Sequence, residues 1–162
     1  MQHLHDDPRA AQGEWHALLP RYLWAAPSLT DKRVLELGCG HGLGSVALCL
    51  HAGCDLTAVD TRPDAIEEAQ RRFEELAHVF RAVPSYLDLG LDAGEGGFDA
   101  ILALREDLPW DEPALLDALR GLLAPGGVLV CVQRTAPWGL ADLLPGAARR
   151  SRRRCAPVTP RA

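Results

Sequence analysis

Three glycines at alternate positions constrain this chain more than any other feature. The short apolar segment 34–37 is followed at once by Gly38, Gly40 and Gly42, and then by a helix-compatible run over 45–50. An apolar run, a glycine-rich break and a helix-compatible run together predict a strand, a tight turn and a helix. Such a turn brings bare backbone close to a ligand, and it directs the free N–H groups of the helix start toward that ligand.

Two common nucleotide-binding loops do not match this turn. A phosphate-binding P-loop needs a Lys-Ser or Lys-Thr pair after its second glycine, and the chain has none there. The dinucleotide fingerprint Gly-x-Gly-x-x-Gly fails in every register, because its sixth position falls on Leu43, Ser45 or Ala47. What the chain has is an acid, Glu36, two residues before the first glycine. Close packing without a ligand is the alternative interpretation of such a turn, and a nicotinamide-dependent enzyme is a third.

The acid followed by Gly-x-Gly-x-Gly over 36–42 resembles the first motif of the class I S-adenosylmethionine-dependent methyltransferases. Two further segments are similar to later motifs of that family. The β-prone run 56–60 ends in Asp60, and the segment 122–130 looks like the helix end, Pro-Gly-Gly turn and fifth strand of the family. The resemblance covers the chain from about residue 31 to residue 133, with the three motifs in the family's order.

This resemblance implies S-adenosylmethionine as the cofactor, and methyl transfer to a small-molecule or protein acceptor as the activity. In the family, the acid after the second strand binds both ribose hydroxyls. Asp60 holds that place, and a carboxylate can accept hydrogen bonds from both arms of a vicinal diol. Thr61 or Arg62 would flank the adenine, and the backbone at Leu104 and Arg105 would face the methionine portion. The implied cofactor-binding residues are Glu36, Gly38, Cys39, Gly40, Gly42, Asp60, Thr61, Ser85 and Leu104.

Two of the implied assignments, the residue that reads the adenine and the role of the N-terminal aromatic residues, have alternatives. The residue that reads the adenine amino group corresponds to Ser85, with Asp88 three residues further on as the other candidate. Tyr22 and Trp24 either form part of a lid over the cofactor or pack an N-terminal segment on the sheet.

No motif identifies a catalytic residue. The candidate bases are Glu106, Asp107 and His41, and each has an alternative interpretation as an ordinary loop or surface residue. The segment 104–110 lacks the Asn/Asp-Pro-Pro-Tyr/Phe motif of members that methylate amide or base nitrogens, which favours the small-molecule and protein-modifying branches. After residue 133 no convincing sixth or seventh strand follows, although the family core has both. A catalytically inactive protein that acts as a cofactor-binding or partner subunit is therefore the alternative function.

Strands that alternate with helices predict a parallel sheet with right-handed crossovers. We expect a three-layer, Rossmann-like α/β fold, with about five parallel strands and helices on both faces. The predicted organisation is an N-terminal helical segment over 1–30, a methyltransferase core over 31–133 and a Pro/Gly/Arg-rich, partly disordered tail over 134–162. The helical spacing predicts a first helix interrupted at Pro20, and an amphipathic helix that runs from Pro63 to Phe80.

Composition narrows the classes of partner. The length of 162 residues fits one domain, and 48% hydrophobic with 24% charged residues is ordinary for a globular protein. No run approaches the roughly 18 apolar residues of a membrane span, and the N-terminus lacks a signal-like core, so we expect a cytoplasmic protein with no membrane partner.

Charge and cysteine spacing add two further expectations. Six arginines lie in the last fourteen residues, which leaves 11 basic against 22 acidic residues elsewhere. Such an acidic body does not favour a nucleic-acid partner. The five cysteines lack Cys-x-x-Cys spacing, so no metal site is expected. A partner subunit or a homodimer stays open.

Overall fold

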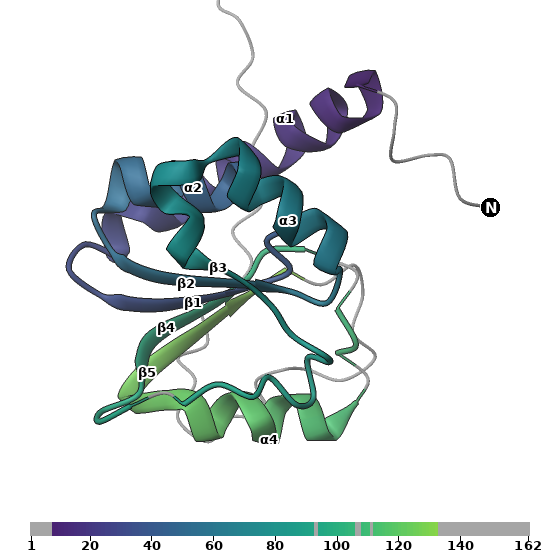
Figure 1. The fold of residues 1–162 in the computed structure, drawn as a ribbon. Helices are drawn as coiled ribbons and strands as arrows, with labels where there is room; N and C mark the ends of the chain where they lie inside the picture. Colours follow the sequence, from purple (N-terminus) through teal and green to yellow (C-terminus); the bar gives the residue numbers. More distant parts are fainter. Residues whose placement is uncertain (1–7, 93, 106–107, 111, 133–162) are drawn as a thin grey trace, which may run out of the picture.

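The computed structural model describes residues 8–92, 94–105, 108–110 and 112–132. Its centre is one five-stranded parallel sheet with the strand order β3-β2-β1-β4-β5 (Figure 1). The strands are β1 (Arg33–Leu37), β2 (Asp55–Asp60), β3 (Phe80–Ala82), β4 (Phe98–Ala103) and β5 (Leu123–Cys131). The predicted parallel, Rossmann-like sheet is confirmed.

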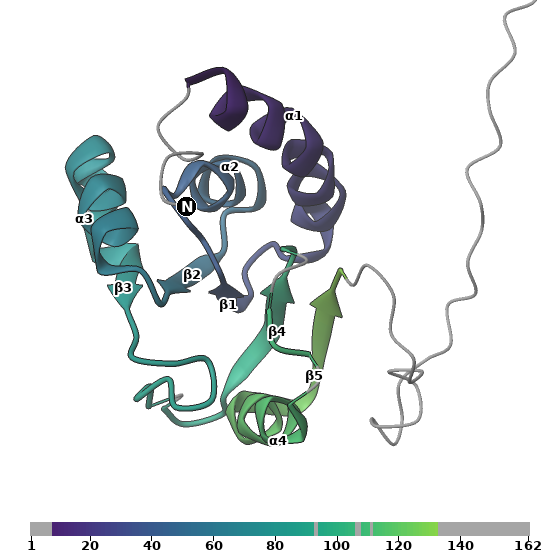
Figure 2. The same cartoon turned by 90° about the vertical axis from the view of Figure 1, so that its right-hand side faces the viewer.

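Helices cover both faces of the sheet, as predicted. One face carries α1 (Pro8–Ala25), α2 (Leu43–Ala52) and α3 (Pro63–Arg72), and the other carries α4 (Pro113–Leu122) (Figures 1 and 2). Two short 3₁₀ helices, η1 (Ala26–Ser28) and η2 (Glu74–Val79), complete the described elements. Within the described ranges, no helix is long and apolar enough to cross a membrane.

The strand order reverses at β1, which lies between β2 and β4. In an open parallel sheet the connections leave this switch point in opposite directions, and ligands bind beyond the carboxyl ends of the strands there. The glycine segment follows the end of β1, and Asp60 is the last residue of β2. Sequence order and topology therefore place both motifs at the one edge where such sheets bind ligands.

The alternation of side chains along β1 divides the core into two parts. Val34 packs in the cluster beneath α1, α2 and α3, whereas Leu35 and Leu37 pack in the cluster on the α4 side. Because successive side chains of a strand point to opposite faces, Glu36 faces the same side as Val34. An ionisable side chain thus stands at a position where the covered sheet would otherwise hold an apolar one.

Two helix predictions were wrong. The first helix does not stop at Pro20 but continues through it to Ala25, and the contacts of the residues that follow Pro20 offset the missing backbone hydrogen bond. The amphipathic helix predicted over 63–80 ends at Arg72, and the chain then forms η2 and enters β3 at Phe80. Spacings of three residues also fit a 3₁₀ turn, so the periodicity did not separate the two.

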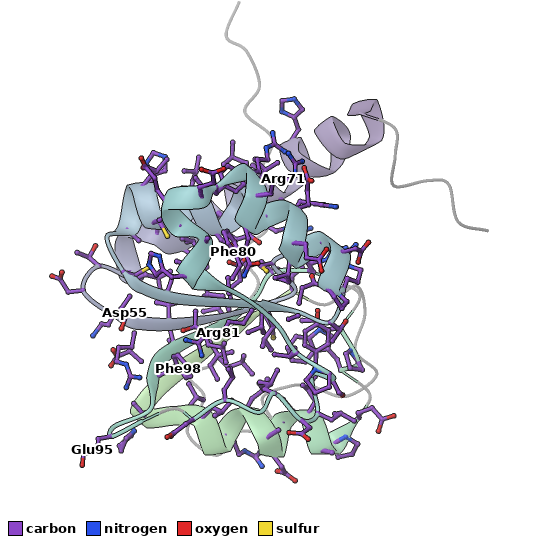
Figure 3. The ribbon with its side chains drawn as sticks, in the orientation of Figure 1. Asp55, Arg71, Phe80, Arg81, Glu95 and Phe98 are labelled. Carbon is purple, nitrogen blue, oxygen red and sulfur yellow. The ribbon has the colours of Figure 1, made fainter. Side chains whose placement is uncertain are left out.

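Figure 3 shows Phe80 between the sheet and the helical layer, whereas Arg71 stands on the outer side of α3. Phe80 is buried, and its carbonyl oxygen accepts a hydrogen bond from the side-chain amide of Gln70 at 3.0 Å. Burial of this ring therefore favours the strand over a longer helix.

The fifth strand begins earlier than predicted. Phe98 of β4 pairs with Leu123, and Ala100 pairs with Val128, so the predicted Pro-Gly-Gly turn lies inside β5 as a bulge rather than before it. The predicted tail and the doubtful sixth and seventh strands lie outside the described residues, and the predicted domain boundaries stay predictions.

The contact between α1 and α2 depends on a glycine. A Cβ atom on Gly44, in the first turn of α2, would overlap the ring of the buried Tyr22 from α1. On the opposite side of the molecule, Gly121 in α4 has nothing within 4 Å of such an atom. Gly44 is the second residue of α2 and Gly121 is the last but one of α4, so both lie in a terminal turn and have different surroundings.

We expect Gly44→Ala to lower the free energy of unfolding by about 1–3 kcal/mol, the usual cost of overpacking a core. Gly121→Ala is the matched control, and we expect it to stabilise the protein by about 0.5–1 kcal/mol because alanine is the better helix former. Urea unfolding followed by circular dichroism measures both values. A Gly44→Ala protein as stable as wild type would contradict the packing described here.

Candidate functional site

The glycine loop is tied to the end of β2 by backbone hydrogen bonds. The N–H groups of Gly38 and Cys39 donate to the carbonyl oxygen of Val59, at 2.8 and 3.1 Å. The N–H of Gly40 donates to the Oδ2 atom of Asp60 at 2.8 Å. All three loop glycines have positive φ angles, between 57° and 81°. The loop is therefore held in one conformation by the neighbouring strand.

Gly42 joins the loop to α2 and must be glycine for two reasons. Its φ angle of 81° is left-handed, and a Cβ atom there would lie only 2.7 Å from the ring of Phe80. As the residue that caps α2, it contributes no side-chain hydrogen bond to the helix start. The N–H groups of the first turn therefore receive no side-chain cap, and N–H groups at a helix start are suited to bind a ligand with acceptor or anionic groups.

Glu36 is fully buried beneath this loop. Its Oε1 atom accepts a hydrogen bond from the Tyr22 hydroxyl at 2.6 Å, and its Oε2 atom accepts one from the Ser45 hydroxyl at 2.7 Å. Burial raises the pKa of Glu36 above its ordinary value, because the charged form loses its hydration, and the two hydrogen bonds reduce this rise without cancelling it. The acid therefore links β1 to both α1 and α2.

Tyr22 and Trp24 have different environments. Tyr22 is buried in the core, which agrees with the packing alternative for this residue, whereas Trp24 is 73% exposed on α1.

Asp60 is 2% exposed and accepts four hydrogen bonds. Its Oδ1 atom accepts from the backbone N–H of Arg62 at 3.0 Å and from Nε of the same residue at 3.1 Å. Its Oδ2 atom accepts from Gly40 N–H and, at 3.4 Å, from Nη2 of Arg62. Burial alone would raise the pKa of Asp60, but the hydrogen bonds from Arg62 and Gly40 outweigh it and hold the pKa below its ordinary value.

Three side chains from separate segments meet over the first two glycines. A Cβ atom on Gly38 would lie 3.1 Å from Cδ of Arg105 and 3.6 Å from the hydroxyl of Tyr86. One on Gly40 would lie 3.4 Å from Nη2 of Arg62 and 3.6 Å from Nη1 of Arg105. The segments that follow β2, β3 and β4 thus converge on the loop.

Tyr86 is the residue that sequence reasoning missed. It is hydrogen-bonded to Thr61, and burial raises the pKa of its hydroxyl to about 12. The nearest signal in the sequence was the position after the third strand, which pointed to Ser85 instead. A tyrosine in a connection carries no pattern of its own, so only the fold brings it to the glycine loop.

The remaining predicted site residues lie in varied environments. Ser85 Oγ accepts from the N–H of Leu87 at 3.1 Å, and Asp88 Oδ1 accepts from the N–H of Gly90 at 3.3 Å, so each stabilises its own turn. The carbonyl oxygen of Leu104 accepts from Nη1 of Arg21 at 2.8 Å.

Of the candidate bases, His41 is exposed in the glycine loop, and Glu106 and Asp107 lie outside the described residues. In the part of the chain that the structure describes, no three His, Cys, Asp or Glu side chains are grouped as metal ligands.

The Methyltransferase domain family matches residues 34–127, more than half of the chain. This match, together with the Rossmann-like sheet and the acid–glycine loop, shows that the chain belongs to the class I S-adenosylmethionine-dependent methyltransferases. S-adenosylmethionine is the methyl donor of that family.

Two curated relatives are ubiquinone biosynthesis O-methyltransferases. The protein from Xanthomonas campestris pv. campestris is 36% identical over 129 residues, which covers 76% of this chain and 53% of the relative. The protein from Xylella fastidiosa is 38% identical over 129 residues, with 76% and 51% covered. The chain therefore spans about half the length of the curated relatives it matches.

A solved structure, the N-methyltransferase NodS from Bradyrhizobium japonicum, is 27% identical with a TM-score of 0.56. The match covers 78% of this chain and 68% of that one. These relatives differ in the atom that their names say they methylate, so family membership leaves the acceptor open.

The buried Glu36 predicts a pH-dependent contribution to stability. Because its pKa is raised in the folded state, its contribution is fully present below the ordinary value of 4.5 and is lost as the pH rises through the raised value. A glutamine keeps the shape and, like the protonated acid, is neutral. We therefore expect the free energy of unfolding of Glu36→Gln, relative to wild type, to increase from pH 4.5 to neutrality.

Urea unfolding at a series of pH values measures this difference. Glu67→Gln, which removes a carboxylate from an exposed position on α3, is the control for the loss of a surface charge. A flat profile for Glu36→Gln would show that burial of the charge has little energetic consequence.

Proposed function

We propose that this chain binds S-adenosylmethionine and transfers its methyl group to a small-molecule or protein acceptor. The observation that carries the proposal is the position of Asp60. Its buried carboxylate lies at the carboxyl end of β2, beside the switch point, and is hydrogen-bonded to the glycine loop. An ionised carboxylate in this position suits the vicinal diol of a nucleoside ribose.

The residues around the loop fit the cofactor. Asp60 would hold the ribose, Thr61 or Arg62 would lie beside the adenine, and the glycine backbone with the start of α2 would receive the amino-acid end. The backbone of Leu104, at the end of β4, would face the methionine portion. The bound cofactor would supply an electrophilic methyl carbon on a sulfonium.

The protein's own part in such a transfer is to align the acceptor and to exclude water. A proton would leave the acceptor during transfer to a hydroxyl. His41, exposed in the glycine loop, is the candidate base within the described residues, and imidazole is the commonest general base.

A small-molecule hydroxyl is the acceptor we favour. Support comes from the printed names of the two curated relatives, both of which are O-methyltransferases. We place the protein in the cytoplasm, because the four cysteines of the described part are free thiols, as is usual in a reducing compartment. A partner subunit or a second copy of the chain belongs to the same proposal.

Calorimetric titration with S-adenosylmethionine and S-adenosylhomocysteine tests cofactor binding. We expect micromolar binding that Asp60→Ala weakens by roughly 100-fold or more, because hydrogen bonds to a charged group contribute about 1.5–3 kcal/mol each. Asp64→Ala, which removes an exposed carboxylate four residues further on, is the matched control and should bind like wild type. Absence of binding by the folded protein would overturn the proposal.

Turnover separates the two functions predicted for this chain. The protein is incubated with S-adenosylmethionine and a panel of hydroxylated small molecules, and S-adenosylhomocysteine is measured by mass spectrometry. Formation that depends on both the acceptor and the protein supports the methyltransferase. Tight cofactor binding without turnover on any acceptor would favour the catalytically inactive, cofactor-binding subunit.

A further inference from the structure

We propose that Arg62 is a displaceable occupant of the ribose position, and that its guanidinium must leave Asp60 before a nucleoside diol can bind. This inference rests on the proposed function, since it concerns the affinity of the same site for its cofactor. It makes Arg62 a residue that sets cofactor affinity by competing for the Asp60 carboxylate, rather than one that only lies beside the adenine.

Asp60 has a limited number of acceptor positions. An ionised carboxylate offers about four lone-pair positions to hydrogen-bond donors. Two of the four are filled by backbone N–H groups, those of Gly40 and Arg62. The other two are filled by Nε and Nη2 of the Arg62 side chain, one on each carboxylate oxygen. All four acceptor positions of the Asp60 carboxylate are therefore occupied in the ligand-free protein.

The two guanidinium hydrogen bonds to Asp60 match the two hydrogen bonds that a vicinal diol would donate. A vicinal diol offers two O–H donors, one for each carboxylate oxygen, and the guanidinium presents one N–H to each oxygen. The backbone bonds cannot be given up as easily, because the bond from Gly40 fixes the glycine loop. Exchange of the side chain for the diol would leave the loop unchanged and all four acceptor positions filled.

The Arg62 side chain can move while its backbone stays in place. Arg62 caps α3 with an extended backbone and makes no side-chain hydrogen bond to the helix start. Its side chain is 36% exposed, whereas that of Asp60 is 3% exposed. The backbone N–H bond to Asp60 is independent of the side chain's position. Rotation of the Arg62 side chain into solvent therefore breaks the ion pair with Asp60 but leaves the backbone in place.

The position of Nη2 supports the same conclusion. This nitrogen would lie 3.4 Å from a Cβ atom on Gly40, so the guanidinium covers the loop glycine that a cofactor must approach. A ligand that contacts both Asp60 and the backbone of Gly40 needs the volume that this group fills.

The test is the affinity of Arg62→Met for S-adenosylhomocysteine, measured by calorimetry. Methionine keeps an unbranched, flexible stem but has no donor, so the carboxylate is left open to the diol. We expect binding roughly five- to tenfold tighter than wild type, the scale of a partly exposed ion pair. Arg62→Lys keeps the charge without the bidentate geometry, so its affinity should lie between those of wild type and Arg62→Met.

Two controls separate competition from a general effect of charge. Arg81→Met removes the same charge from an exposed position on β3 and should leave the affinity unchanged. In the Asp60→Asn background, Arg62→Met should change the affinity for S-adenosylhomocysteine little, because the ion pair is already lost. The double-mutant cycle measures this coupling directly.

Stability of the ligand-free protein supplies an independent measurement. Removal of the guanidinium leaves a buried carboxylate without its cation, so Arg62→Met should melt at a lower temperature than wild type and than Arg81→Met. Addition of S-adenosylhomocysteine should then raise the melting temperature of Arg62→Met by more than it raises that of wild type.

The outcomes distinguish this inference from the proposed function. If wild type binds and Arg62→Met binds equally or more weakly, Arg62 does not compete, and only the inference fails. If neither protein binds while both are folded, the proposed function fails and the inference fails with it. If Arg62→Met binds more tightly than wild type and this gain is lost in the Asp60→Asn background, both the inference and the proposed function are supported.

Discussion

Burial of one carboxylate determines how this site is built. Glu36 stands near the end of the central strand on a face that is covered by helices, so its carboxyl oxygens need hydrogen-bond partners inside the protein. The hydroxyls of Tyr22 and Ser45 are these partners, one from α1 and one from α2. Since both helices must be in place to satisfy the same acid, their positions are coupled to the strand end from which the glycine loop departs.

The two acids at this edge of the sheet, Glu36 and Asp60, have different roles because their surroundings differ. Burial raises the pKa of Glu36, whose partners are neutral hydroxyls, whereas the pKa of Asp60 is lowered by the guanidinium and N–H groups around it. A fully enclosed acid with short bonds is suited to a structural role. An acid whose cation can move into solvent is suited to exchange one set of donors for another.

Local pattern was enough to predict the strands, the glycine loop and the place of Asp60 at a strand end, because each depends on residues close together in the sequence. The Tyr22–Glu36 bond, the approach of Tyr86 to Gly38 and the Arg62 ion pair were not predicted. Each depends on where the fold brings a side chain whose own segment carries no periodic signal. The bulge in β5 was not predicted for a related reason, since its register is set by pairing with β4 rather than by the Pro-Gly-Gly turn alone.

The continuation of α1 through Pro20 follows from the same kind of long-range contact. The two residues after the proline reach both sides of the switch point: Arg21 donates to the carbonyl oxygen of Leu104 beyond β4, and Tyr22 donates to Glu36 on β1. A helix that ended at Pro20 would not hold these consecutive side chains in that arrangement. The lost backbone bond at the proline is therefore offset by two tertiary hydrogen bonds and by the burial of Tyr22, and α1 joins the strand ends between which the cofactor is proposed to bind.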